Sequence, residues 1–190
     1  HAALHLLDAL LEVRVAGVDV APGVDDRDDG LARVVGAVEA HLRRLADQPL
    51  TPRTPVTWQV PVCYENAPDL DEVARRTGLS TEAVIAAHLA GDYRVFLYGF
   101  APGYAYMGGL PEAIKLDRKT TPVRGVPAGQ IIIAGTMCLI TTLVMPTGWW
   151  IIGRTPTRVL TGDEARPFLF DVGDHIQFPR VSPADYEALP

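Results

Sequence analysis

The sequence predicts an α+β region over residues 1–66 and a mainly β region over residues 67–190, which two short helices introduce. The first third of the chain alternates helical and extended patterns, and an open α+β sandwich accommodates such an alternation. After Tyr93, short apolar runs between glycines and prolines indicate strands joined by turns. The segment Gly125–Gly153 carries no charge, but glycine and proline divide it into strand-length pieces. Buried strands therefore fit this segment better than a membrane-spanning helix.

Four elements are expected in the first third of the chain. Leucines at helical spacing in His1–Glu12 predict the end of an amphipathic helix, and alternating valines in Val13–Val20 predict a short strand. Leu31–Ala46 has the clearest helical pattern, because its apolar residues form one stripe with charged side chains off it. Val56–Tyr64 alternates as a half-buried strand does, and Pro61 within it indicates an edge or a bulge.

Two short helices follow, each with its own start signal. Asp69 is the expected N-cap of the first, with Glu72 completing a capping box and Gly78 standing where the helix ends. Ser80 or Thr81 is expected to cap the second helix, because each offers a side-chain oxygen just before an apolar run.

The rest of the chain is expected to be rich in strands. Tyr93–Gly99 predicts a strand that leads into an aromatic, glycine-rich turn at Phe100–Leu110. Both alternating faces of Met137–Met145 are apolar, so one face is expected in a barrel interior and the other in a subunit interface. Ser182 is expected to cap a terminal helical turn. The other predicted strands are Gln130–Ala134, Trp149–Ile152 and Val172–Phe178.

The bulk composition narrows the class of protein. Hydrophobic residues make up 48% of the chain and charged residues 21%, which is enough apolar material for a core and argues against disorder. A net charge of −6 argues against a broad nucleic-acid-binding surface. Cys63 and Cys138 lie far apart without metal-ligand spacing, and we expect buried thiols of a cytoplasmic protein. The GxSxG, HExxH and phosphate-loop signatures do not occur in the sequence.

Three features point to chemistry, and each has a structural alternative. His88 lies on the apolar face of its helix, where a lone histidine is more often a hydrogen-bonded core residue than a catalyst. The run Phe100–Tyr106 fits either an aromatic pocket with exposed backbone N–H groups or a crossover packed against a barrel mouth. The nearby basic residues are either anion ligands or solvated surface charges: Arg118, Lys119, Arg124 and Arg154.

A series of short motifs in a fixed order resembles one protein family. The motifs are Val62–Tyr64, Asp69–Val73, His88, Gly99–Gly103, Gly108–Leu110, Val126–Gly129, Gly148–Trp149 and Ile152–Pro156. In these motifs the chain resembles allophanate hydrolase subunit 1, a family that includes the B subunit of the bacterial 5-oxoprolinase and the sporulation kinase inhibitor KipI. The resemblance extends over about Val56 to Pro190.

The resemblance implies a fold and an assembly. Residues 1–66 are expected to form a ferredoxin-like α+β domain, and residues 67–190 a cyclophilin-like β-barrel domain with two leading short helices. The implied partner is an allophanate hydrolase subunit 2-like protein with a related barrel, in a heterodimer or heterotetramer. In the 5-oxoprolinase member, such a pair works with a third protein to open a cyclic amide using ATP. ATP is therefore expected in the complex, and neither a metal ion nor biotin is expected on this chain.

The resemblance also implies a function. We expect a hydrolase subunit that acts on the C–N bond of a small amide or urea-derived substrate and is inactive alone. The alternative is a KipI-like inhibitor that binds a histidine kinase without catalysis. His88 is the expected general acid or base, or a hydrogen-bond donor to the substrate. The residues expected to bind the substrate are Phe100, Pro102, Gly103, Tyr104, Arg118 and Arg154.

The chain departs from the usual family sequence at three places. Met137–Thr142 replaces a Gln-Thr-Gly-hydrophobic-Tyr-Pro run, Pro146–Trp149 replaces Pro-Gly-Gly-Trp, and Asp117–Lys119 replaces Pro-Arg-Arg. A glutamine and a tyrosine that a pocket can use are thus replaced by apolar or short side chains. The identity of the substrate therefore stays open at this point.

Overall fold

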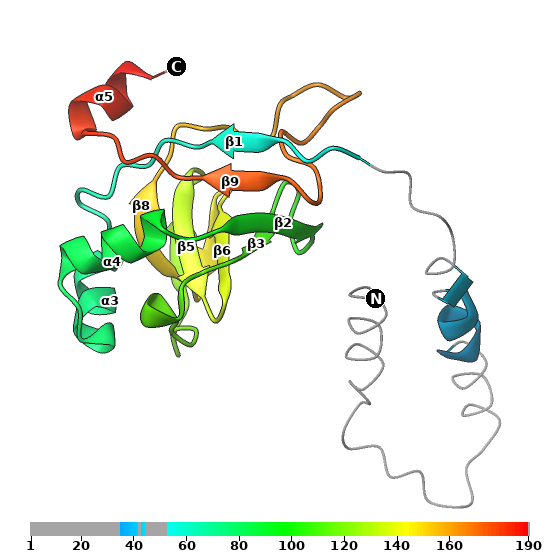
Figure 1. Cartoon of the computed structure of the whole chain (residues 1–190), viewed down its shortest axis with the longest axis horizontal. Coiled ribbons are helices and arrows are strands. Elements are labelled where there is room, and N and C mark those ends of the chain that lie inside the picture. Colours follow the sequence, from blue (N-terminus) through cyan, green and yellow to red (C-terminus); the bar gives the residue numbers. More distant parts are fainter. Residues whose placement is uncertain (1–34, 42, 45–52, 190) are drawn as a thin grey trace, which may run out of the picture. The chain divides into compact units, whose positions relative to one another are not determined.

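A computed structural model describes residues 35–41, 43–44 and 53–189 (Figure 1). The chain divides into two compact units, His1–Arg53 and Thr54–Pro190. In the first unit, the described residues 35–41 and 43–44 are helical and fall within the helix predicted for Leu31–Ala46. The helix predicted for His1–Glu12 and the strand predicted for Val13–Val20 lie outside the described residues. The ferredoxin-like arrangement that includes them therefore stays a prediction.

The second unit is built mainly from short strands. Its helical elements are α3 (Leu70–Thr77), α4 (Thr81–Leu89), the 3₁₀ turn η1 (Glu112–Ile114) and α5 (Pro183–Ala188). Its strands are β1 (Thr57–Gln59), β2 (Tyr93–Tyr98), β3 (Ala105–Gly108), β4 (Val123–Val126), β5 (Gln130–Ala134), β6 (Met137–Ile140), β7 (Met145–Thr147), β8 (Trp150–Arg154) and β9 (His175–Gln177).

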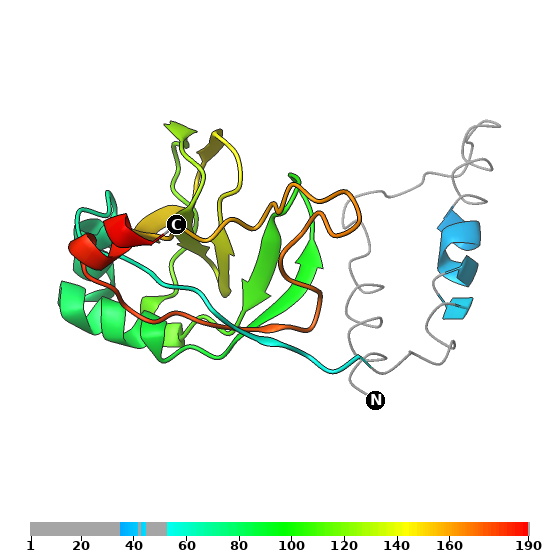
Figure 2. The ribbon, with the colours of Figure 1, turned by 90° about the horizontal axis from the view of Figure 1, so that it is seen from above.

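Seven of these strands form one curled sheet in the order β1-β9-β2-β3-β6-β5-β8 (Figures 1 and 2). Its neighbours are antiparallel except for β1 and β9, which run parallel. The two edges of the sheet are bridged, because the segment after β1 pairs with the end of β8. Cys63 and Arg154 exchange backbone N–H···O bonds of 2.9 Å in each direction. β4 and β7 form a separate two-stranded sheet. The mainly β barrel that the sequence predicts is thereby confirmed as a curled sheet bridged at one end.

The uncharged segment after Arg124 folds as predicted, into strands and turns. β5 has the predicted bounds, and the remainder supplies β4, β6, β7 and β8. Among the described residues, none of the helices has the length and apolar character needed to cross a bilayer. Two predictions need correction: Phe100–Leu110 is not only a turn, because it contains β3, and Met137–Met145 is interrupted after Ile140 by an irregular stretch.

The sheet carries a separate apolar cluster on each face. Alternate side chains of β5 and β6 divide between the clusters, with Ile131 and Cys138 in the larger and Ile132 and Leu139 in the smaller. The smaller cluster also contains Tyr104, Val126, Ala134, Trp149 and Ile151. The second apolar face of β6 is therefore covered by the chain's own residues. Leu143 and Val144, later in the same predicted stretch, are exposed, and the subunit interface expected for Met137–Met145 stays a prediction. Leu139 is only 1% exposed in the chain alone.

Helix capping follows the sequence in two of three cases. The Ser80 hydroxyl accepts from Ala83 N–H at 3.2 Å, and Ser182 caps α5 in the same way. The capping box at Asp69 is wrong, because α3 has no side-chain cap. The Asp69 carboxylate instead accepts from Lys119 Nζ at 2.5 Å and from Ile151 N–H at 2.7 Å. It ties α3 to β8 rather than to its own first turn.

Candidate functional site

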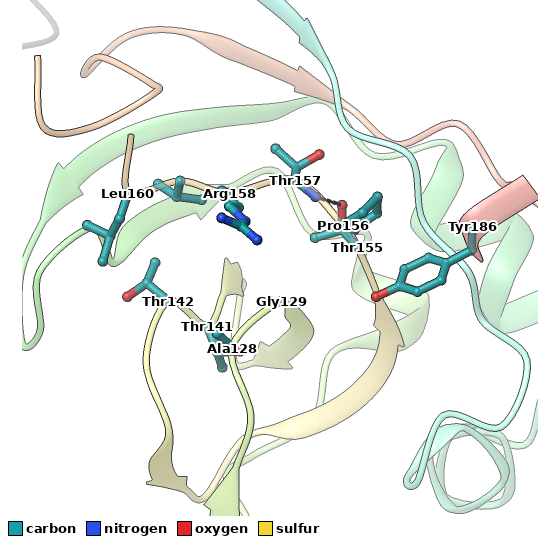
Figure 3. A pocket seen from close by; sticks show the side chains of 11 residues that line it. Ala128, Gly129, Thr141, Thr142, Thr155, Pro156, Thr157, Arg158, Leu160 and Tyr186 are labelled. Atoms are coloured by element: carbon teal, nitrogen blue, oxygen red, sulfur yellow. Dashed lines mark hydrogen bonds between the residues drawn. The ribbon is translucent and has the colours of Figure 1, made fainter. Parts of the chain in front are cut away.

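A cavity of about 350 Å³ lies where the turn before β5, the end of β6 and the segment after β8 meet (Figure 3). Ligand sites in proteins commonly fall in this range of volume. Threonine hydroxyls and backbone groups make up much of its wall. The lining residues are Ala128, Gly129, Thr141, Thr142, Thr155, Pro156, Thr157, Arg158, Val159, Leu160 and Tyr186.

Backbone hydrogen bonds fix the floor of this cavity. Gly129 N–H donates to Thr141 O at 2.7 Å, and Thr155 N–H donates to Gly129 O at 2.8 Å. Gly129 has a φ of +80°, and a Cβ there would lie 2.7 Å from Thr155 O. Only glycine fits both conditions without strain. The Thr141 hydroxyl donates to Pro127 O and accepts from Gln130 N–H, each at 2.8 Å, so it is engaged in holding the turn.

Arg158 is the cation of this cavity. Figure 3 shows its guanidinium directed into the cavity, between the side chains of Thr142 and Thr155. Among the described residues, Arg158 has no hydrogen-bond or ion-pair partner. An arginine without a partner beside hydroxyl groups is suited to a planar carboxylate, which it can bind with two parallel hydrogen bonds. The arrangement therefore favours a small anionic ligand.

Tyr186 reaches the cavity from α5, and Arg154 holds it there. The phenol of Tyr186 points toward the same space as Arg158 (Figure 3). The Arg154 guanidinium lies 4.4 Å from the centre of the Tyr186 ring and 3.7 Å from Glu187 Oε1. Cation–π contact and ion pairing therefore attach α5 to the end of β8. Arg154, expected to bind the substrate, lies behind the wall of this cavity rather than in it.

The Pro102–Gly103 bend lies on the other side of the same wall. The Thr142 hydroxyl donates to Pro102 O at 2.6 Å. Gly103 has a φ of +74°, and a Cβ there would lie 2.7 Å from the Leu160 side chain and 3.1 Å from that of Thr142. Because Thr142 and Leu160 line the cavity, the bend shapes it from outside. Pro102 and Gly103 are thus close to the cavity without lining it.

A second, smaller pocket of about 90 Å³ contains three of the predicted substrate-binding residues, Phe100, Tyr104 and Arg118. The Arg118 guanidinium lies 5.6 Å from the centre of the Trp149 ring. Phe100 is 76% exposed and has a φ of 67°, a conformation that bulky residues rarely adopt. The backbone at Phe100 is therefore locally strained, and this conformation places its aromatic ring at the pocket.

His88 lies apart from both pockets. It is fully buried, with Nδ1 2.6 Å from the Tyr64 hydroxyl and Nε2 3.5 Å from Cys138 Sγ. Burial lowers the pKa of His88 to about 3, so its imidazole is neutral at neutral pH. It contacts the larger apolar cluster, whereas Tyr104 belongs to the smaller cluster on the opposite face of the sheet. The geometry favours the core alternative stated for this histidine.

Three polar residues of the larger cavity lie outside the motifs that the sequence analysis names: Thr157, Arg158 and Tyr186. Arg158 and Thr157 follow directly after the motif Ile152–Pro156, and Gly129 ends the motif Val126–Gly129. These two motifs meet at the cavity floor. Arg158 could have been found from the sequence, because it is a charged residue that closely follows the motif Ile152–Pro156 in a stretch with few charges. Tyr186 has no such signal, because only the fold of α5 brings it there.

The fold and these motifs define a known class of domain. The model of the family "Carboxyltransferase domain, subdomain C and D" matches residues 3–170, and the chain belongs to this family. It is 42% identical to the B subunit of 5-oxoprolinase from Bacillus subtilis (strain 168) over 132 residues, which are 68% of this chain and 55% of that protein. The subunit of the same name in Escherichia coli O157:H7 is 37% identical over 122 residues, 63% of this chain and 56% of that one. The chain spans about half the length of these curated relatives.

Two solved structures place the fold. A conserved uncharacterized protein from Pyrococcus horikoshii superposes with a TM-score of 0.65 at 28% identity, over 97% of this chain and 89% of that chain. The urea carboxylase of Kluyveromyces lactis gives a TM-score of 0.54 at 16% identity, over 70% of this chain and 14% of that chain. The second likeness concerns the fold alone.

Proposed function

We propose that this chain is a subunit of a 5-oxoprolinase-type complex and that its larger cavity binds the carboxylate of a small amide substrate. The observation that carries the proposal is Arg158, whose guanidinium enters a hydroxyl-lined cavity without a protein partner among the described residues. The two curated relatives, each the B subunit of a 5-oxoprolinase, support the same class of substrate.

The cavity positions a substrate but lacks groups for proton transfer. Its lining residues include no histidine, cysteine or carboxylate. Threonine hydroxyls and the Tyr186 phenol can orient an amide through hydrogen bonds, whereas the general base of an enzyme is most often a histidine or a carboxylate. Opening a C–N bond needs such a base or an activated phosphoryl group. We infer that a partner supplies it, so that this chain contributes half of a shared reaction chamber and is inactive alone.

An exposed apolar surface beside the cavity supports a partner at this end of the sheet. Phe100 is 76% exposed, and Val144 is 71% exposed. The Thr142–Pro102 hydrogen bond brings the segments that carry these two residues together. We define Phe100, Leu143 and Val144 as the mouth patch. Its proposed occupant is an allophanate hydrolase subunit 2-like protein, which with a third component provides the ATP-dependent step in the cytoplasm.

The test is the reconstituted complex with Arg158→Ala. We expect kcat/KM for ATP-dependent ring opening of 5-oxoproline to fall by about 10–100-fold, the effect of losing a charge-assisted pair of hydrogen bonds. Arg158→Lys should recover part of the loss. The matched control is Arg75→Ala, an exposed arginine of α3 paired with Glu72, which should change kcat/KM less than about twofold. Unchanged turnover by the folded Arg158→Ala complex would remove this cavity as the substrate site.

A kinase-binding role is the second candidate, and the mouth patch favours it equally as a docking surface. Capture by the full chain separates the two. Stoichiometric capture of the subunit 2-like protein supports the enzyme, whereas capture of a histidine kinase dimerisation domain with loss of autophosphorylation supports the inhibitor.

A further inference from the structure

We propose that the smaller pocket is a second binding site, specific for a small inorganic oxyanion such as phosphate or bicarbonate. We call it the Arg118 pocket, lined by Phe100, Tyr104, Tyr106, Arg118, Ile132, Leu139, Pro146, Thr147, Gly148 and Trp149. It goes beyond the carboxylate site at Arg158, because the two pockets share no lining residue.

The Arg118 pocket is small. Its volume is about 90 Å³, against about 350 Å³ for the cavity at Arg158. A small ion is therefore a better match to it than an organic substrate of the size that the larger cavity accommodates.

Arg118 supplies the charge. Among the described residues it makes no ion pair and no hydrogen bond, and its guanidinium carbon lies over the Trp149 ring, 5.6 Å from the ring centre. A guanidinium over an aromatic ring can keep N–H groups at its edge available for a ligand. Two of those N–H groups can bind two oxygens of one ion.

Two phenols complete the pocket. Tyr104 is 5% exposed, and burial, with Tyr106 as a second cause, raises the pKa of its hydroxyl. The hydroxyl therefore stays protonated and can donate a hydrogen bond at neutral pH. The pocket also includes the buried side chains of Ile132 and Leu139. Arg118 itself is exposed, so solvent screens part of its attraction for an anion.

The experiment titrates the full chain, without partners, with sodium phosphate and separately with sodium bicarbonate at constant ionic strength. Isothermal calorimetry gives affinity and stoichiometry, and tryptophan fluorescence reports on Trp149. We expect a saturable site that depends on Arg118 for at least one of the two ions, with the tighter binder identifying the ligand. Arg118→Ala should weaken binding by about tenfold or more, and Tyr104→Phe by about threefold.

The matched controls come from the other cavity. Arg158→Ala and Tyr186→Phe should change the affinity for the same ion by less than about twofold, because the Arg118 pocket does not include them. Equal weakening by Arg118→Ala and Arg158→Ala, or no saturable binding of either ion, overturns the proposal. Should Arg118→Ala fold poorly, Arg118→Lys and Tyr104→Phe carry the same test. The Arg158 proposal is judged by turnover in the complex, so the two proposals fail separately.

Discussion

At the scale of single residues, His88 occupies a closed shell of aromatic side chains. The rings of Tyr93 and Phe178 lie 5.1 Å and 4.8 Å from its own, and the Tyr64 hydroxyl is at Nδ1. A charged imidazole there would lose its hydration without gaining a carboxylate in exchange. The network Tyr64–His88–Cys138 is therefore a fully buried polar link between α4 and the sheet. Its loss should lower the free energy of unfolding.

Replacement of His88 by alanine should lower the free energy of unfolding by about 2–4 kcal/mol, because it leaves a cavity and an unpaired Tyr64 hydroxyl. Urea unfolding of the full chain measures this. The matched control is His175→Ala, a partly exposed histidine of β9, which should cost less than about 1 kcal/mol. If His88→Ala retained full stability while the reconstituted complex lost turnover, the core interpretation would be wrong and the catalytic one right.

The same histidine predicts a dependence of stability on pH. Its pKa is about 3 in the folded chain, below the ordinary value of 6.5. The unfolded chain therefore binds the proton more readily, and the stability that neutral His88 contributes is lost progressively as pH falls from about 6.5 toward 3. We expect His88→Asn to show a shallower decline of the urea midpoint over this range than the unaltered chain. Parallel curves for the two proteins would contradict the assignment.

At the scale of elements, two glycines should behave differently: Gly125 in β4 and Gly129 in the turn before β5. Gly129→Ala meets Thr155 O at 2.7 Å in a backbone with φ of +80° and should cost about 2–4 kcal/mol. Gly125→Ala has a similar φ of +67° but open space around its Cβ, so it should cost only about 1 kcal/mol. Thermal unfolding of both variants gives the comparison. Equal costs would mean that backbone conformation, not the contact with Thr155, requires glycine at the cavity floor.

The attachment of α3 to the sheet is a second prediction at this scale. Asp69 and Lys119 are 16% and 10% exposed, so removing one charge leaves the other poorly solvated. Asp69→Ala should cost about 2–4 kcal/mol, whereas Asp71→Ala on the exposed side of the same helix should cost less than about 0.5 kcal/mol. Urea unfolding measures both. The double variant Asp69→Ala/Lys119→Met should recover part of the loss, and no recovery would argue against the ion pair.

These elements also show what a sequence can and cannot indicate. β5 has the bounds that the sequence predicts, because alternation and flanking glycines are local signals. β3 escapes prediction because its composition, aromatic and close to glycine, is also that of a turn. The role of Asp69 escapes prediction because its partners Lys119 and Ile151 are 50 and 82 residues away in sequence. The cavity at Arg158 depends on the same kind of distant convergence.

At the scale of the whole molecule, the question is which surface meets the proposed partner. The mouth patch combines exposed apolar side chains with two segments that the Thr142–Pro102 hydrogen bond joins, and Thr142 lines the larger cavity. A partner that supplies the missing base has to approach an open cavity from outside, and apolar side chains near that approach would be buried by it.

The double variant Phe100→Ser/Val144→Ser should therefore weaken capture of a subunit 2-like protein by about tenfold or more without lowering thermal stability, since both side chains are exposed in the free chain. Val172→Ser is the matched control, because Val172 is 54% exposed in the turn before β9 and lies outside the patch. Calorimetry with the purified partner measures the affinity of the unaltered chain, the double variant and the control. Equal weakening by Val172→Ser, or no weakening by the double variant, would place the partner elsewhere on the chain and leave the missing base unexplained.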